Sequence, residues 1–194
     1  PGSIKIGGSR DDGVNIKPKY VSLAGIAPGG QTDGAFETRR NYGDDARSEV
    51  ILNAANEILL VSCTQSINFP VVGAAFQTVF GGGRQDGLLL KFTPGLTALQ
   101  YSSFFGGPGS DACFVLSINP TNSDIYVGGA TTSTNLPGNK SGVIGSTYQG
   151  GLTDGFVFQL NPSMSSIVKT TYLGTAGNDM LYGVQFDKFG FPYV

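Results

Sequence analysis

Aspartates placed in glycine-rich turns are the side chains of this sequence best suited to chemistry. They recur at Asp-Gly turns and at the ends of blocks that open with glycine: Asp33, Asp86 and Asp154 in the first set, and Asp11, Asp12, Asp44, Asp45, Asp111 and Asp179 in the second. Such carboxylates can bind calcium through their oxygens, work in opposed pairs in glycosidases, or accept hydrogen bonds from the N–H groups of tight turns. The spacing of the aspartates along the chain distinguishes among these three roles.

The spacing favours the structural role. The block Gly106–Asp111 matches the start of the G-G-x-G-x-D calcium-binding nonapeptide, but that motif needs tandem copies at every ninth position. Here the copies recur with a period of about 67 residues, and acids that return at the same place in every copy look architectural. We therefore expect no cofactor. Two alternatives stay open: calcium, best suited to the adjacent pairs Asp11-Asp12 and Asp44-Asp45, and a glycan-active enzyme that uses a pair of these aspartates.

Other catalytic chemistries lack their residues. The chain has no histidine and no tryptophan, which excludes Ser-His-Asp and Cys-His nucleophiles and histidine-ligated metals. It has no G-x-S-x-G or Walker-type motif, and the glycines 81–83 are interpreted as a turn. Cys63 and Cys113 lack counterparts in neighbouring repeats, so we expect half-buried thiols rather than a disulfide between them. We thus predict no catalytic residue, no metal ligand and no enzyme activity.

Composition bounds the class of protein. With 194 residues, 40% hydrophobic and 13% charged, the chain can form one sizeable core, and 30 glycines and 10 prolines indicate many turns. A net charge of −2 without a cluster of Lys and Arg argues against nucleic-acid binding. The longest aliphatic run, residues 58–61, is far shorter than the roughly 20 residues that span a bilayer, so no membrane span is expected.

A repeat with a period of about 67 residues organises the sequence. The block aspartates Asp45, Asp111 and Asp179 follow one another at this period, and the Asp-Gly turns at Asp86 and Asp154 keep it too. Between them, segment 56–70 aligns with segment 123–137 at a constant offset. Independent landmarks with one period are strong evidence of a structural repeat.

Each unit predicts four antiparallel strands. In the unit that starts at Asp111 they are expected at 112–118, 124–131, 155–160 and 167–173, with turn residues between them. Alternation within 112–118 predicts burial on one side of that strand, and Gly128-Gly129 predicts close approach by a neighbouring backbone. Residues 49–62 also fit a helical stripe, but the repeat aligns their middle with the turn at 121–123, so a strand, a turn and a strand are predicted.

Repeated four-stranded antiparallel sheets form the blades of β-propellers. The predicted fold is all-β, a β-propeller of blades of about 67 residues that is part of a larger propeller. The expected boundaries are an abbreviated N-terminal blade at 1–44, blades at 45–110 and 111–178, and the start of a further blade at 179–194. We expect the following residues in the core between blades: Ala112, Phe114, Leu116, Ile118, Tyr126, Phe156 and Phe158.

The ends repeat incompletely. Asp12 precedes Asp45 by only about half a period, and the segment 191–194 aligns with 124–127 in the middle of a second strand. Because propellers close with four to eight blades, the remaining blades are expected from additional chain or from a partner.

The combination of Tyr101–Gly107, a following aspartate, a strand–turn–strand, Asn-Leu/Phe-Pro, Tyr/Phe-Gln, Gly-Gly and Asp-Gly-Phe-Val resembles the bacterial β-propeller repeat family known as SBBP. The resemblance covers residues 40–194 well and 4–39 patchily. It implies one blade per unit, often in long secreted or cell-surface proteins, many of them cargo of bacterial secretion systems, and no common catalytic residues.

The expected function is therefore a non-enzymatic scaffold or binding platform for protein or carbohydrate, as in adhesion, outside the cell or on its surface. Secretion machinery is a further expected partner. The loop 132–149, the longest and most polar connection, is the predicted place for a ligand.

Overall fold

The computed structural model describes residues 2–10, 12–13 and 48–194, and over these the chain is all-β, without a helix. A helix long and apolar enough to cross a membrane is accordingly not found in this part of the chain. Residues 14–44 of the expected abbreviated N-terminal blade lie outside the described residues.

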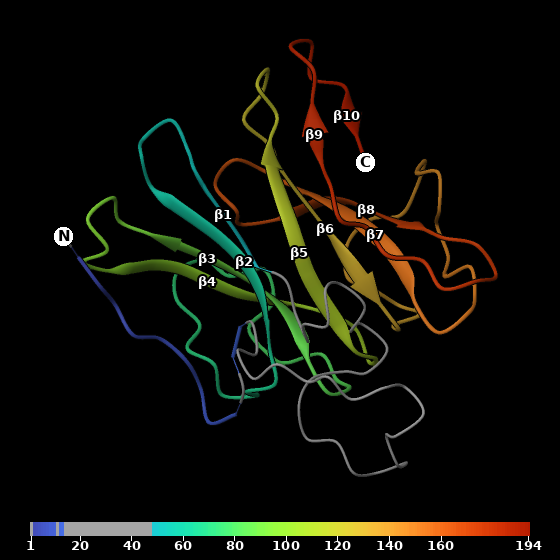
Figure 1. Ribbon diagram of the computed structural model, residues 1–194, viewed down its shortest axis with the longest axis horizontal. Helices are drawn as coiled ribbons and strands as arrows, with labels where there is room; N and C mark the ends of the chain where they lie inside the picture. Colours follow the sequence, from blue (N-terminus) through green and yellow to red (C-terminus); the bar gives the residue numbers. More distant parts are fainter. Residues whose placement is uncertain (1, 11, 14–47) are drawn as a thin grey trace, which may run out of the picture.

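Two four-stranded antiparallel sheets and a short hairpin make up the described fold (Figure 1). The first sheet contains β1 (Glu49–Leu52), β2 (Ile58–Thr64), β3 (Asp86–Phe92) and β4 (Leu99–Phe105). The second contains β5 (Asp111–Ile118), β6 (Ile125–Thr131), β7 (Asp154–Leu160) and β8 (Ile167–Leu173). β9 (Gln185–Phe186) and β10 (Pro192–Tyr193) form the C-terminal hairpin. In each sheet the strand order follows the chain order.

The strand prediction is confirmed. The four strands expected after Asp111 begin and end within one residue of the observed bounds. Residues 49–62 form a strand, a turn and a strand, not a helix. Two such sheets are what successive blades would provide, and closure into a propeller remains a proposal.

The main core lies between the two sheets. Figure 1 shows β5 between the first sheet and the rest of its own sheet, and β5 contacts strands of the first sheet along its length. The Phe158 ring stacks on Phe105 at 3.8 Å between centroids and meets the edge of Phe76 at 6.2 Å. Burying large aromatic rings is a major source of stability, so this contact joins the two sheets into one body.

A β-bulge in β5 contradicts the predicted one-sided burial of that strand. Cys113 pairs with Gly129 and Val115 with Gly128, which leaves Phe114 as the extra residue. Such a bulge breaks the two-residue alternation. Phe114 and Val115 therefore both join the core on the far side of the sheet, while Leu116 and Ile118 contact the core between the sheets.

The seven predicted core residues accordingly divide between two cores. Leu116, Ile118, Phe156 and Phe158 pack between the two sheets. Ala112, Phe114 and Tyr126 pack on the other face of the second sheet, against residues that include Leu181, Val184 and Phe186. The segment after β8 thus covers part of the second sheet as the second sheet covers the first.

The Gly128-Gly129 pair lies where a neighbouring backbone approaches closely, as predicted. A Cβ on Gly129 would overlap the carbonyl oxygen of Ala112 on β5, and a Cβ on Gly128 would meet the side chain of Leu181. Only glycine allows β5 and β6 to pair at this spacing.

The hairpin tips share one kind of turn. In the first sheet Asn53 Oδ1 accepts from the N–H groups of Ala55 and Glu57, and in the C-terminal hairpin Asp187 Oδ1 accepts from Phe189 and Phe191. The tip residue with positive φ is Asn56 in the first case and Gly190 in the second. Because a side-chain acceptor holds each turn, the tips are preorganised.

Candidate functional site at the repeated aspartates

Asp111 is fully buried at the start of β5, where donors from three residues surround its carboxylate. Thr131 Oγ1 donates to Oδ1, while Gly107 N and Ser133 Oγ each donate to Oδ2 at 2.8 Å. Its own N–H donates to Gln85 O in the first unit at 2.8 Å. Burial raises the pKa of Asp111 to about 6, partly offset by these donors. The carboxylate therefore fastens the turn that links the two sheets.

Asp86, at the start of β3, is the second buried carboxylate of this junction. Its Oδ2 accepts from Gly81 N at 2.6 Å, but Oδ1 has no hydrogen-bond partner among the described residues. A Cβ atom placed on Gly106 would lie 2.5 Å from Asp86 Oδ1 and 2.8 Å from Asp111 Oδ2. The two carboxylates are therefore close neighbours. Burial, together with the charge of Asp111, raises the pKa of Asp86 to about 8. At neutral pH Asp86 is mostly protonated.

The next unit repeats this arrangement. Asp154 Oδ2 accepts from Gln149 N at 2.5 Å, and its Oδ1 again lacks a partner in the described part of the chain. Asp179 N donates to Thr153 O at 2.8 Å, as Asp111 N does to Gln85 O. Burial, with a further contribution from Asp179, raises the pKa of Asp154. The same position therefore has the same structural role in both units.

Asp12 stands where the repeat was expected to place Asp45. Gly8 N donates to Asp12 Oδ2 at 2.8 Å and Thr64 Oγ1 donates to Oδ1, the same contacts that Asp111 makes with Gly107 and Thr131. A β-bridge also joins Asp12 to Thr64. The N-terminal block therefore packs against the sheet that we predicted to begin after residue 45. Asp11, Asp33, Asp44 and Asp45 lie outside the described residues.

The carboxylates of Asp111 and Asp179 accept hydrogen bonds from N–H and O–H groups, which is evidence against the calcium alternative. Asp111 accepts from N–H and O–H groups on its two oxygens, and Asp179 Oδ2 accepts from Thr175 N at 2.7 Å and Thr175 Oγ1 at 2.8 Å. Calcium sites need six to eight oxygen ligands facing the ion. No cluster of three or more acidic, histidine or cysteine ligands occurs within residues 2–10, 12–13 and 48–194. The hydrogen-bonding role predicted for these aspartates is what the described geometry supports.

Removal of divalent ions is therefore expected to leave the melting temperature unchanged. Thermal unfolding is followed by far-UV circular dichroism, once with excess EDTA and once with excess calcium. The two midpoints should agree within about 1 °C, since a ligand that does not bind the folded state cannot stabilise it. A rise of several degrees in calcium, reversed by EDTA, would restore the calcium alternative.

The cysteines lie deeper than predicted. Cys63 is 4% exposed and Cys113 is 0% exposed, so both are buried rather than half-buried. Cys113 carries a thiol, so the predicted absence of a disulfide between them is confirmed. Burial, reinforced by the charge of Asp111, raises the pKa of Cys113 well above its ordinary value. A buried neutral thiol is a poor nucleophile.

The predicted ligand loop 132–149 lies along β8 instead of standing free. Thr170 N donates to Asn139 O at 3.0 Å and Tyr172 N donates to Gly145 O at 2.8 Å. The Tyr172 hydroxyl joins the start of the loop by accepting from Leu136 N at 2.8 Å and donating to Ser133 O at 3.0 Å. The loop also forms one wall of a hollow of about 220 Å³, lined by residues that include Val143, Ile144 and Lys169.

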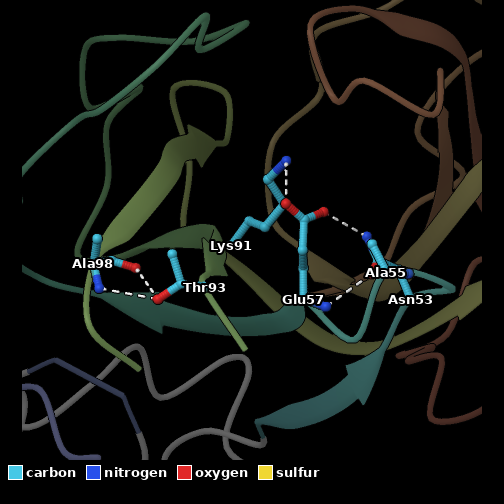
Figure 2. Close-up of polar contacts among 6 residues, drawn as sticks. All are labelled: Asn53, Ala55, Glu57, Lys91, Thr93 and Ala98. Carbon is cyan, nitrogen blue, oxygen red and sulfur yellow. Dashed lines mark hydrogen bonds and ion pairs between the residues drawn. The ribbon is translucent and has the colours of Figure 1, made fainter. Parts of the chain in front are cut away.

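A polar group at the tip of the first sheet was missed from the sequence. Figure 2 shows the Glu57 carboxylate between Lys91, at 3.5 Å, and Asn53, whose Nδ2 donates at 2.7 Å. In the second sheet Gln159 Nε2 donates to Asp124 Oδ2 at 2.6 Å in the equivalent place. The repeat alignment could have found this pairing, because Glu57 and Lys91 align with Asp124 and Gln159. A hollow of about 260 Å³ lies nearby, where the tips of both sheets meet.

Comparison with known proteins adds no family. The chain matches no protein-family model and has no significant match among curated proteins.

Proposed function

We propose that this chain is a non-enzymatic β-propeller region of a secreted or cell-surface bacterial protein, serving as a scaffold or binding platform for protein or glycan. The observation that carries the proposal is the burial of the repeated acids. Asp86, Asp111 and Asp154 are all inaccessible to solvent, and each accepts a hydrogen bond from the turn that precedes its strand. Groups that hold every unit together in the same way serve the architecture.

The antiparallel sheets support the propeller part of this proposal. Each sheet is a four-stranded meander, the form that a propeller blade takes, and a core joins the first to the second. The proposed extracellular or cell-surface location and the link to bacterial secretion systems come from the SBBP resemblance alone.

A glycan-active enzyme is the second candidate. It is favoured by the pair Asp86 and Asp111, since adjacent carboxylates with raised pKa values are typical of glycosidases. Against it, a sugar must reach both carboxyl groups, and both are buried to 0% exposure.

The test is hydrolysis and binding measured on one preparation. The purified chain is expected to release no product from a panel of chromogenic α- and β-glycosides, and to be retained by bacterial surface glycans or surface proteins immobilised on a chip. Turnover that is lost in Asp86→Asn, with the variant still folded by circular dichroism, would instead establish the enzyme. Absence of both turnover and retention would contradict both candidates.

A further inference from the structure

One face of the second sheet is only partly covered by the described residues, at positions whose counterparts in the first sheet are covered. Residues of the first unit that contact the second sheet have counterparts one repeat later in the chain. The pairs are Leu59 and Tyr126, Phe76 and Ile144, Leu89 and Val157, Tyr101 and Lys169, and Phe105 and Leu173.

Hydrogen bonds confirm the alignment of Phe76 with Ile144, which lie in the long loops before β3 and β7. Gln77 N donates to Ser103 Oγ at 3.1 Å in the first unit, and Gly145 N donates to Thr171 Oγ1 at 3.0 Å in the second. Ile144, which precedes Gly145, therefore occupies the place of Phe76. In the first unit this place is filled by contact with Phe158 of β7.

In the second unit the described residues cover only part of the corresponding face. The Tyr126 ring meets Phe186 edge-on at 4.9 Å, but Ile144 is 88% exposed. It lines the hollow of about 220 Å³ together with Val157 and Lys169. This is smaller than the roughly 300–1,000 Å³ of small-molecule pockets, and fits a side chain or two better than a separate ligand.

A second unpartnered feature lies in the C-terminal hairpin. β10 pairs with β9 on one side, as β6 pairs with β5. β6 is also paired on its other side, with β7, whereas the described residues offer β10 no such partner. Unpaired strand edges favour strand addition. Since β7 supplies both the pairing of β6 and the aromatic rings that fill the first sheet's face, one strand can satisfy both features.

We propose that β10 and the hollow at Ile144 together bind a strand of the β7 type from a further repeat unit, an Asp-Gly pair followed by alternating large apolar residues. This rests on the repeat architecture proposed above. By the register of β6 with β7, the residue opposite Tyr193 corresponds to Gln159, and the residue opposite Val194 corresponds to Phe158. The side chain in the place of Phe158 enters the hollow, as Phe158 itself packs on Phe76.

The tip of the β9–β10 hairpin indicates which kind of side chain the bound strand carries at one position. Glu57 and Asp124 bind polar partners, Lys91 on β3 and Gln159 on β7. The residue that aligns with Glu57 and Asp124 at the tip of the β9–β10 hairpin is Phe191, which is 64% exposed. The strand that belongs here is therefore expected to carry an apolar residue in the place of Lys91 and Gln159, because burying an unpaired polar group against phenylalanine is unfavourable.

Neither strand of this type among the described residues can be supplied by a second copy of the chain. Both β3 and β7 are internal strands, hydrogen-bonded to neighbours on both sides. Their aromatic and aliphatic side chains are already buried in the cores of the two sheets. The occupant is therefore a unit beyond those described.

Binding of a labelled hairpin peptide tests the proposal. A synthetic peptide with the sequence of residues 154–173 supplies a β7-type strand with its β8 partner, and fluorescence anisotropy measures its binding to the full chain. We expect saturable binding, tighter for a Gln159→Leu peptide, and weaker by a factor of about 10 or more for a peptide with Phe156→Ser and Phe158→Ser. Equal binding of all three peptides, or none at about 1 mM, would overturn the proposal.

Matched variants of the chain locate the site. Ile144→Glu is expected to weaken peptide binding by a factor of about 10 or more, because it places a charge in the hollow. Val79→Glu, at a position 71% exposed in the first unit, is expected to leave binding unchanged. Equal effects of the two changes would contradict the assigned site. Failure here would leave the hydrolysis and retention results of the proposed function unaffected, so the two proposals fail separately.

Discussion

Replacing Asp86 by asparagine is expected to remove most of the pH dependence of stability between pH 6 and 8. Asp86 is buried beside Asp111 and Cys113, with one oxygen unpartnered among the described residues. Its pKa is about 8 in the folded protein, against an ordinary value of 3.8. Asparagine keeps an acceptor for Gly81 N and places an N–H₂ group where the unpartnered oxygen lies, without a charge at any pH.

The direction of the effect follows from proton binding. Between pH 4 and 8 the folded protein holds a proton on Asp86 that the unfolded chain has released, so the free energy of unfolding falls as pH rises. The slope approaches about 1.4 kcal/mol per pH unit for one such group. Asp111, with a pKa of about 6, adds to this slope only below about pH 6. From pH 6 to 8 the Asp86 contribution is therefore separable.

Urea unfolding followed by circular dichroism at pH 6, 7 and 8 checks the prediction. The wild-type midpoint should fall steadily over this range, and the Asp86→Asn midpoint should stay nearly constant and be the higher of the two at pH 8. Asp187→Asn, in the turn between β9 and β10, is the matched control and should keep the wild-type slope. A wild-type protein whose stability does not fall from pH 6 to 8 would show that Asp86 is already ionised in the folded state at pH 6.

Gly129→Ala is expected to be the most damaging of three glycine substitutions. Its Cβ would overlap the main-chain carbonyl oxygen of Ala112 and approach the Phe156 ring, and neither the backbone nor this buried ring can move freely. Overpacking of this kind costs about 3 kcal/mol or more when backbone has to shift. Gly128→Ala should cost less, because its Cβ meets the end of the flexible Leu181 side chain.

Gly183→Ala is the control for this series, because a Cβ there meets nothing within 4 Å. It should change the free energy of unfolding by less than about 0.5 kcal/mol. The three variants, compared by urea unfolding, should rank Gly129, Gly128 and Gly183 from largest loss to smallest. Equal stability of the Gly129 and Gly183 variants would show that β5 can move away from β6.

The sequence predicts the strands well because each ambiguous segment can be compared with its aligned copy in the neighbouring repeat. Residues 49–62 fit a helix when taken alone, and their alignment with the turn at 121–123 corrects this. The bulge at Phe114 gives no such signal, since every residue from Ala112 to Leu116 is apolar and any of them could face either side. Alternation alone cannot place an extra residue in a strand that is buried on both faces.

The site was predictable in kind but not in detail. The repeat indicates that Asp86 and Asp154 have the same role, and their glycine-rich turns indicate that this role is hydrogen bonding. That Asp86 meets Asp111 depends on how two sheets pack, which no local pattern encodes. The placement of Asp12 against Thr64 was missed for a similar reason, because the contact joins two residues far apart in sequence across a segment of irregular length.

The chain-order arrangement of each sheet has a consequence for how the protein forms. Every strand of β1–β4, and again of β5–β8, pairs with the strand next to it in sequence, so each meander can close over short distances, and low contact order favours fast folding. During synthesis the first sheet can assemble while β5 is still in the ribosome. The block at Gly8 and Asp12 cannot dock before β2 is made, because Thr64, the residue that Asp12 contacts, lies at the end of β2. We therefore expect the block, although made before the first sheet, to settle onto it only after β2 has been made.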